Sequence, residues 1–360
     1  MYARIQKLCC TFLLILCLIP SSARAASGMP DSARFGYGGR VDLRGRDLFA
    51  TIEEAGRLNL DWIAVDFDWQ HLQPSAEQTP LWNELDEVMA RAQENEISVM
   101  ISINQVPSWV MTENGPDAQM TADLAASLAH RYPGTLLALE LFPSANTFQG
   151  WGTQPNPQAY SLLLKTTWET LNAIDPGIAL VAGGLTPLSS SGGGIDDLVF
   201  LAALYQAGAA EYMPIVGVHL PSTGQDPLTA NSQNAQPILR HYEALRQVMV
   251  ENGHKSGLLW ITAFSWDSKT LPDPNDQAAW LKQAYLLFRS QLYIGAAFFD
   301  GLNPDQTGKP TLFYQNGQPH PGFEELVQII AQDHNSQTVQ INLEWLKKLS
   351  NKDHLKGNQP

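Results

Sequence analysis

The sequence predicts a single-domain α/β protein with the architecture of a (β/α)8 (TIM) barrel. Eight short apolar runs follow one another along the chain, and amphipathic stretches separate them without an internal break. Once a leader of 25 residues is set aside, about 335 residues remain, a typical length for eight strand and helix units in one barrel. In this architecture, binding and catalytic groups lie at the carboxyl ends of the strands.

Each apolar run is short enough to be a strand that is buried on both faces, as the strands of a parallel sheet are. We expect strands at or near Phe35–Gly38, Trp62–Trp69, Ile97–Asn104, Leu136–Phe142, Ile178–Leu185, Pro214–Leu220, Leu258–Phe264 and Tyr293–Phe299.

The stretches between these runs have apolar residues at helical spacing. They predict helices at Leu48–Leu58, Trp82–Asn95, Ala122–Tyr132, Pro157–Ile174, Ile195–Ala207, Ile238–Asn252 and Gln277–Gln291. We expect Asp276 to cap the helix that starts at Gln277. We expect Asp175-Pro176-Gly177 to end the helix at Pro157–Ile174.

A doubly wound open sheet is the alternative architecture. Such a sheet normally has a glycine-rich phosphate turn after its first strand. The segment Gly36-Tyr37-Gly38-Gly39 lacks the full spacing of that turn. The glycine-rich run Ser189–Gly194 has no Lys-Ser/Thr beside it, so we expect it to be a loop.

Residues 1–25 have the pattern of a secretory signal peptide. Arg4 and Lys7 precede an apolar run that is too short to span a membrane permanently, and small residues lead to a cleavage point after Ala25. We expect the barrel to occupy residues 26–333 and a polar tail to occupy residues 334–360. All three cysteines lie in the leader, so the mature chain has no thiol. Export to an extracellular or other extracytoplasmic place is the expectation.

The charge of the mature chain restricts its partners. Removal of the leader lowers the number of Lys and Arg residues from 22 to 19, and against 36 acidic residues the formal charge is about −17. This charge opposes binding to nucleic acid or to anionic membranes. No apolar run after the leader is long enough for a membrane helix. The eight histidines follow no metal-ligand spacing, so neither a metal nor a cofactor is expected.

One segment resembles a known family. Residues Ala138–Asn146, followed by Gly150-Trp151-Gly152, resemble the fourth-strand region of clan A glycoside hydrolases, the retaining (β/α)8 enzymes that include cellulases. In that family the segment reads roughly Glu-Ile-Trp-Asn-Glu-Pro-Asn. On this chain, Pro143 replaces the family asparagine, Ser144 the catalytic acid/base and Ala145 the proline.

A second segment strengthens the resemblance. Residues Leu259–Trp266 are similar to the family's Trp-Ile-Thr-Glu-Phe-Gly-Trp at the end of the seventh strand, and Ala263 falls on the nucleophile. Weaker landmarks follow in family order at Trp69–Pro74, Asn104–Trp109, Val216–His219 and Gln315–Phe323, where a closing turn and a final helix are implied. The resemblance covers nearly the whole mature chain.

The two replacements remove the chemistry that the family uses. Retaining hydrolysis needs one carboxylate as nucleophile and a second carboxyl group about 5 Å away as acid. Alanine cannot attack, and a serine hydroxyl is no acid near neutral pH. Glu140 lies deeper in the barrel, and we expect it to be a buried partner of another polar group. If catalysis has moved, the candidates are Asp300, Asp68 and Glu140, with Asp66 also near the mouth.

Other residues at the predicted strand ends could hold a sugar. Flat rings stack on pyranose faces and polar groups orient the ligand. The candidates for ligand contact are Trp69, Asn104, Trp109, Phe142, Asn146, Trp151, His219, Trp266 and Phe299. Packing beneath long loops is the alternative role for the rings.

We therefore expect a secreted glycoside-hydrolase-like barrel that binds a neutral oligosaccharide or polysaccharide without cleaving it. One alternative is an active glycosidase with displaced carboxylates. Another is a scaffold whose barrel only presents loops to a partner. A binder retains stacking and hydrogen bonding while dispensing with stabilisation of the transition state.

Overall fold

The computed structural model describes residues 35–43, 48–188, 193–220, 226–229, 238–266, 273–302, 312–313 and 318–335. The predicted signal peptide lies outside these residues, as do all of the predicted tail but its first two positions and part of the glycine-rich run Ser189–Gly194.

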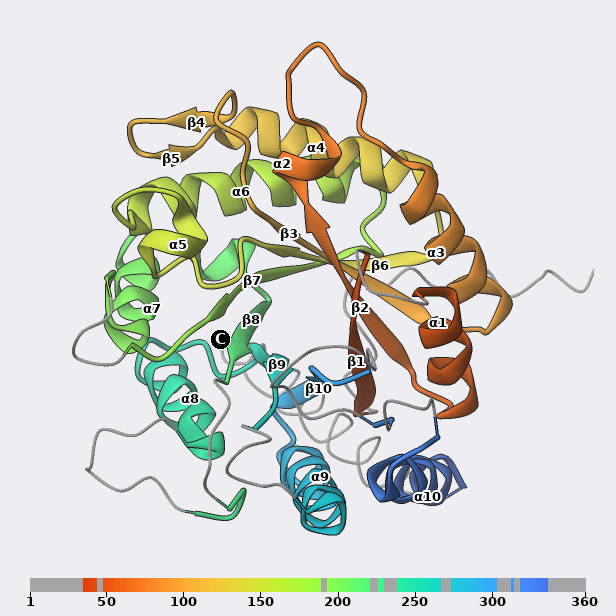
Figure 1. Ribbon diagram of the computed structural model, residues 1–360. Coiled ribbons are helices and arrows are strands. Elements are labelled where there is room, and N and C mark those ends of the chain that lie inside the picture. The colour runs from red at the N-terminus through yellow and green to blue at the C-terminus, as the bar shows by residue number, and fades with distance from the viewer. Residues whose placement is uncertain are drawn as a thin grey trace, which may run out of the picture.

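Within the described residues, eight parallel strands close into a barrel, which confirms the predicted fold class (Figure 1). The strands are β1 (Gly36–Asp42), β2 (Trp62–Asp68), β3 (Ser98–Asn104), β6 (Leu136–Leu141), β7 (Ala179–Leu185), β8 (Ile215–His219), β9 (Leu258–Phe264) and β10 (Ile294–Phe299). Their order around the barrel follows the chain, and β1 pairs with β10 to close it. Each strand lies where an apolar run predicted one.

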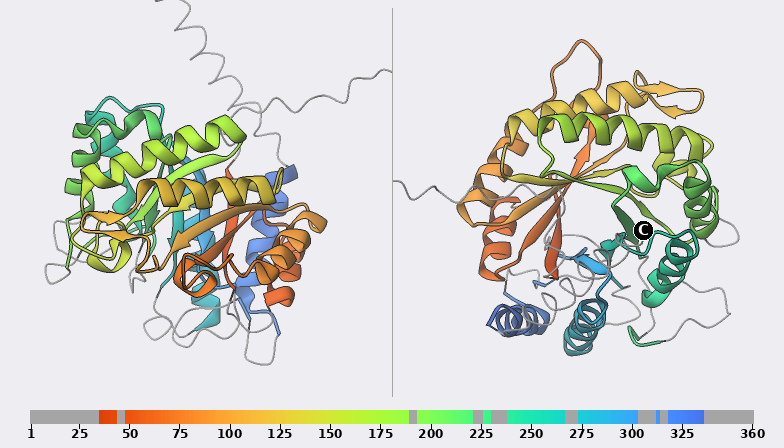
Figure 2. Two further views of the ribbon diagram at one scale, coloured as in Figure 1. Left: turned by 90° about the horizontal axis from the view of Figure 1, so that it is seen from above. Right: turned by 180° about the vertical axis from the view of Figure 1, so that it is seen from behind.

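Helices surround the barrel on its outside (Figure 2). The long ones are α1 (Leu48–Arg57), α3 (Asn83–Glu94), α4 (Ala118–Arg131), α6 (Pro157–Ile174), α7 (Asp197–Gln206), α8 (Tyr242–Glu251), α9 (Pro274–Arg289) and α10 (Pro321–Asn335). Shorter elements decorate the connections: α2 (Trp69–Leu72), α5 (Phe148–Trp151), the hairpin β4 (Met111–Thr112) and β5 (Gly115–Pro116), and the 3-10 helices η1 (Ala209–Tyr212) and η2 (Leu239–His241). Among the described residues, no helix combines the length and apolarity that a bilayer span requires.

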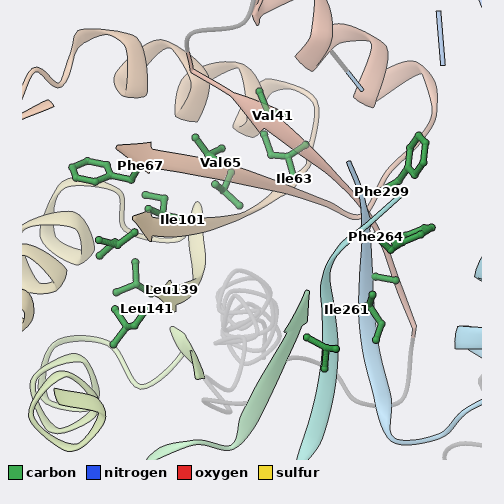
Figure 3. Close-up of a cluster of buried hydrophobic side chains, with 14 of the residues drawn as sticks. Val41, Ile63, Val65, Phe67, Ile101, Leu139, Leu141, Ile261, Phe264 and Phe299 are labelled. Carbon is green, nitrogen blue, oxygen red and sulfur yellow. The ribbon is translucent and has the colours of Figure 1, made fainter. Parts of the chain in front are cut away.

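Alternation along the strands separates two apolar layers. Side chains such as Val65, Ile101 and Leu139 point outward and pack under the helices (Figure 3). Alternate residues fill the barrel interior near the amino ends of the strands, where the rings of Trp62 and Trp260 meet edge to face at 5.0 Å. Burial of both faces explains why the strands read as continuous apolar runs.

Side-chain caps fix where several helices begin. Asp117 caps α4, Asn156 caps α6 with Pro157 in its first turn, and Asp196 caps α7. The predicted cap of α9 is wrong: Asp273 accepts the N–H of Asn275, and Asp276 lies inside the first turn. The helix begins at Pro274 because proline suits a first turn, where its missing N–H would have no helical partner.

Helix α10 reaches the first two residues of the segment that is predicted to be a polar tail. His334 lies in the last turn of this helix. Its ring lies 2.7 Å from the amide nitrogen of Asn59 and 3.3 Å from Asp61, which ties the end of the helix to the turn before β2. The barrel therefore extends at least to Asn335.

Candidate functional site

Ser144 lies just beyond β6, at the carboxyl end of the barrel. Its Oγ is 2.6 Å from Oγ1 of Thr186, and its N–H donates to the carbonyl of Gly184 at 2.8 Å. Phe142 and Ser144 both have left-handed backbone, with φ of 53° and 63°. Such conformations are uncommon for residues other than glycine and cluster at functional sites. The turn that holds the acid/base in the resembled family is thus a strained turn that ends in a hydroxyl.

Ala263 lies near the end of β9 and pairs in register with His219 of β8. The register shifts between Val218 and His219, and such bulges re-aim side chains near active sites. The side chain of His219 is 21% exposed, whereas Ala263 is 9% exposed. At the position that the sequence resemblance aligns with the family nucleophile, the side chain is a methyl group.

The two replaced positions are joined by a run of close neighbours. Gly184 of β7 accepts the hydrogen bond from Ser144, and a Cβ on Gly184 would lie 2.1 Å from the His219 ring. His219 in turn lies opposite Ala263. The carboxyl ends of β6, β7, β8 and β9 thus form one continuous side of the barrel mouth.

A charged layer lies beneath the mouth. Arg40 of β1 forms an ion pair with Asp66 of β2, donates to the carbonyl of Thr262 at 2.7 Å and lies 3.7 Å from Oε2 of Glu140. Burial alone would lower the pKa of Arg40, and the carboxylates of Asp66, Glu140 and Asp300 more than reverse that effect. One guanidinium therefore compensates several carboxylates.

Asp66 is the perturbed acid of this layer. Burial raises its pKa above the ordinary value, Arg40 opposes that shift, and Asp300 adds to it. Because 32% of the side-chain surface remains exposed, solvent moderates the effect. The side-chain amide of Asn104, a predicted ligand-binding residue, donates to the Asp66 carboxylate at 3.2 Å. Asn104 therefore lies beside Asp66 at the mouth.

The three fallback acids have different surroundings. Glu140 is fully buried: the hydroxyl of Ser102 donates to its Oε2 at 2.5 Å, and its Oε1 lies 3.9 Å from Nε2 of His219 without a hydrogen bond. Asp68 caps α2 by accepting the N–H of His71 at 2.9 Å. Asp300 is partly exposed at the end of β10. Asp68 and Asp300 are therefore both partly open to a ligand, whereas Glu140 is not.

A cavity of about 110 Å³ opens beside β1, β2 and β3. Its walls include Asp42, Asp66, Asp68 and Glu84, together with Asn104. This side of the mouth is therefore acidic. In the part of the chain that the structure describes, no three His, Cys, Asp or Glu side chains are grouped so that they could hold a metal ion.

Most of the aromatic candidates lie in the core. Trp69, Phe142, Trp151 and Phe299 are at most 1% exposed, and Trp266 is 3% exposed. Without an open face, these rings support the walls of the mouth and offer no stacking surface in this structure. The indoles of Trp69 and Trp151 are also engaged, with Gln73 and with the carbonyl of Asn114.

The remaining candidates are either buried or partly exposed at the mouth. Trp109 is half-buried, stands edge-on to Trp69 at 5.8 Å and donates to the carbonyl of Gln73. Asn146 is fully buried and bonds the backbone of Thr186 and Ile195, so it closes the loops above β6 and β7. His219 and Asn104 are thus the polar candidates with access to the mouth.

Sequence reasoning missed three residues of the mouth. Arg40 is a cation between Gly39 and Val41 in the buried part of β1, which is a signal for a buried ion pair. Thr186 directly follows β7, at the edge where ligands bind. Phe148 follows the glycosidase-like segment by two residues and is 46% exposed.

Comparisons with known proteins agree with this geometry. No protein-family model matches the chain, and no curated protein matches it by sequence. Among solved structures, it is similar to a family 39 glycoside hydrolase from Bacteroides cellulosilyticus WH2, with 19% identity and a TM-score of 0.62 over 83% of this chain. The match spans 64% of that longer protein.

The chain has the fold of glycoside hydrolases. Xylanase 10B from Thermotoga petrophila RKU-1, solved with xylobiose, matches 83% of this chain and 95% of its own length, with 14% identity and a TM-score of 0.60. GH5_18 from Streptomyces cattleya, solved with GlcNAc, matches 84% and 82%, with 13% identity and a TM-score of 0.62. These are clan A barrels, the group that the two sequence segments resemble.

Proposed function

We propose that this protein binds a neutral oligosaccharide or polysaccharide at the barrel mouth and does not hydrolyse it. One observation carries the proposal: a glycosidase-like barrel has Ser144 and Ala263 at the two strand ends where the resembled enzymes have carboxylates. A pyranose needs hydrogen bonds and stacking to be bound, and it needs the two carboxyl groups only to be cleaved.

The surroundings of Glu140 support the loss of hydrolysis. Glu140 lies in β6, four residues before Ser144, and is fully buried against Ser102 and Arg40. A retaining enzyme needs a carboxylate in contact with the anomeric carbon. Glu140 has no surface through which it could make that contact.

We propose in addition that the protein is exported. The basis is the leader-like pattern of residues 1–25 and the acidic mature chain without cysteine. A carbohydrate outside the cytoplasm fits both features.

An active glycosidase is the second candidate, and one observation favours it. Asp66 and Asp300 both act on Arg40, and the pKa of Asp66 is raised by burial. A buried acid with a raised pKa can keep the proton that a general acid donates. In this version Asp66 donates a proton, and Asp300 is the second carboxyl group near Arg40.

The test measures binding and cleavage on the same samples. Xylohexaose, cellohexaose and chitohexaose are titrated by calorimetry, and the mixtures are then assayed for new reducing ends. Ala263→Phe fills the mouth beside His219 and should abolish binding. Ala210→Phe adds the same ring at an exposed position of η1, near the amino ends of the strands, and should have no effect.

The outcomes separate the candidates. Binding without new reducing ends supports the proposal. Cleavage that disappears in Asp300→Asn establishes the displaced glycosidase. If wild type, Ala263→Phe and Ala210→Phe all fail to bind any of the three oligosaccharides, the binding proposal is overturned and the scaffold alternative remains.

A further inference from the structure

Phe148 is an exposed aromatic ring on the β6 side of the mouth, next to the side that holds the acidic cavity. It is the first residue of α5, which follows β6 closely and lies between the β4–β5 hairpin and α7 (Figure 1). Its side chain is 46% exposed, in contrast to the buried rings of Phe142 and Trp151 in the same segment. An exposed ring at the ligand-binding end of a barrel is a stacking surface for a sugar.

The ring is held in place by the neighbouring loop. The N–H of Phe148 donates to the carbonyl of Gly193 at 3.2 Å, and Thr147 bridges to Gly194. A Cβ on Gly193 would lie 2.4 Å from the Phe148 ring, so the ring rests directly on the backbone there. Because the ring is fixed on one side before a ligand arrives, little ordering remains for binding to impose.

Hydrogen-bonding groups belong to the turn that leads to Phe148 and to the end of β7. The N–H and hydroxyl of Thr147 both donate to the carbonyl of Ser144, which keeps Phe148 close to that residue. The hydroxyls of Ser144 and Thr186 are paired at 2.6 Å and belong to partly exposed residues. A flat apolar ring beside neutral hydroxyl groups is what sugar recognition uses.

The charge of this side distinguishes it from the rest of the mouth. Residues 142–154 and 183–188 contain no charged side chain. The cavity beside β1, β2 and β3 has four carboxylates in its wall. A ligand without charge is therefore favoured on the β6 and β7 side.

We propose that Phe148 is the stacking platform of a subsite for a neutral pyranose, with Ser144 and Thr186 as hydrogen-bonding partners of its hydroxyl groups. This inference rests on the proposed carbohydrate binding and specifies where one sugar ring lies. The strained turn at Ser144 then serves to present a hydroxyl beside the ring.

The test compares two exposed phenylalanines. Phe148→Ala should weaken binding of xylohexaose, cellohexaose or chitohexaose by roughly tenfold, the loss expected for one aromatic stacking contact. Phe49→Ala removes a ring that is 41% exposed on α1, where Arg91 lies over it, and should leave the affinity unchanged. Phe148→Trp should restore the affinity.

A second variant acts on the position of the ring alone. Gly193→Ala puts a methyl group into the space of the Phe148 ring and should weaken binding by displacing the ring, although no ligand-contacting side chain is removed. Equal affinity of Phe148→Ala and wild type, in a protein whose binding Ala263→Phe abolishes, overturns the platform and leaves the proposed function standing. Failure of the wild type to bind any of the three sugars overturns both.

Discussion

At the residue scale, the proposed absence of hydrolysis rests on Ser144 and Ala263. Prediction: the double change Ser144→Glu with Ala263→Glu gives slow hydrolysis of a bound oligosaccharide where wild type gives none. The rate should stay far below that of an intact glycosidase, because φ of 63° at position 144 strains a glutamate there. The control is Ser144→Gln with Ala263→Gln, which has nearly the same shape and no carboxylate. Equal inactivity of both folded variants would contradict the prediction.

Asp66 makes stability depend on pH. Since its pKa is raised, its contribution to folding is complete below the unfolded value of 3.8 and is lost as the pH rises through the folded value. Prediction: Asp66→Asn flattens the fall in urea midpoint as the pH rises from that value. Asp86→Asn is the control. The hydrogen bond from Arg131 lowers the pKa of Asp86, so this carboxyl group changes the pH slope of stability in the opposite sense. The same pH slope in Asp66→Asn and wild type would refute the assignment.

Some site residues could be predicted from the sequence and others could not. Ser144 and Ala263 were found because the segments around them have a recognisable order of residue types. The burial of Trp151 and Phe299 could not be inferred, because an aromatic at a strand end reads alike whether it packs inward or faces a ligand. Tertiary contacts decide whether such a ring is buried, and they leave the Phe148 side chain exposed.

At the element scale, the strands were predictable and the small elements were not. A strand that is buried on both faces, such as β9, reads as a continuous apolar run. Such runs can be recognised as strands because helical patterns alternate with them along the chain. The four-residue helices α2 and α5 and the β4–β5 hairpin are too short to show any periodicity. These short elements form the walls of the mouth, so the sequence predicts the barrel better than the shape of its site.

The start of α9 provides a stability test of the corrected cap. Prediction: Asp273→Ala lowers the free energy of unfolding by about 1 kcal/mol, because the side chain that accepts the N–H of Asn275 is lost. Asp276→Ala, in the first turn of the same helix, should cost only a fraction of that amount. Urea unfolding of both variants measures the difference. A larger loss for Asp276→Ala would show that the original cap prediction was right.

At the scale of the whole molecule, the barrel interior changes character from one end to the other. Apolar residues such as Met100, Trp260 and Phe298 fill it near the amino ends of the strands. Arg40 and Glu140 lie in the charged layer above them. The mouth above that layer has an acidic side, at the cavity beside β1, β2 and β3, and a side at residues 142–154 and 183–188 that has no charged side chain.

The central claim is binding without cleavage, and one measurement tests it most directly. The purified protein is incubated with a mixed pool of oligosaccharides, and the sugars retained on the protein and those left free are analysed by mass spectrometry. If the protein binds without cleaving, intact oligosaccharides are retained and the free sugars keep their original lengths. Shortened sugars in solution would contradict the claim and would move attention to Asp300 and Asp66.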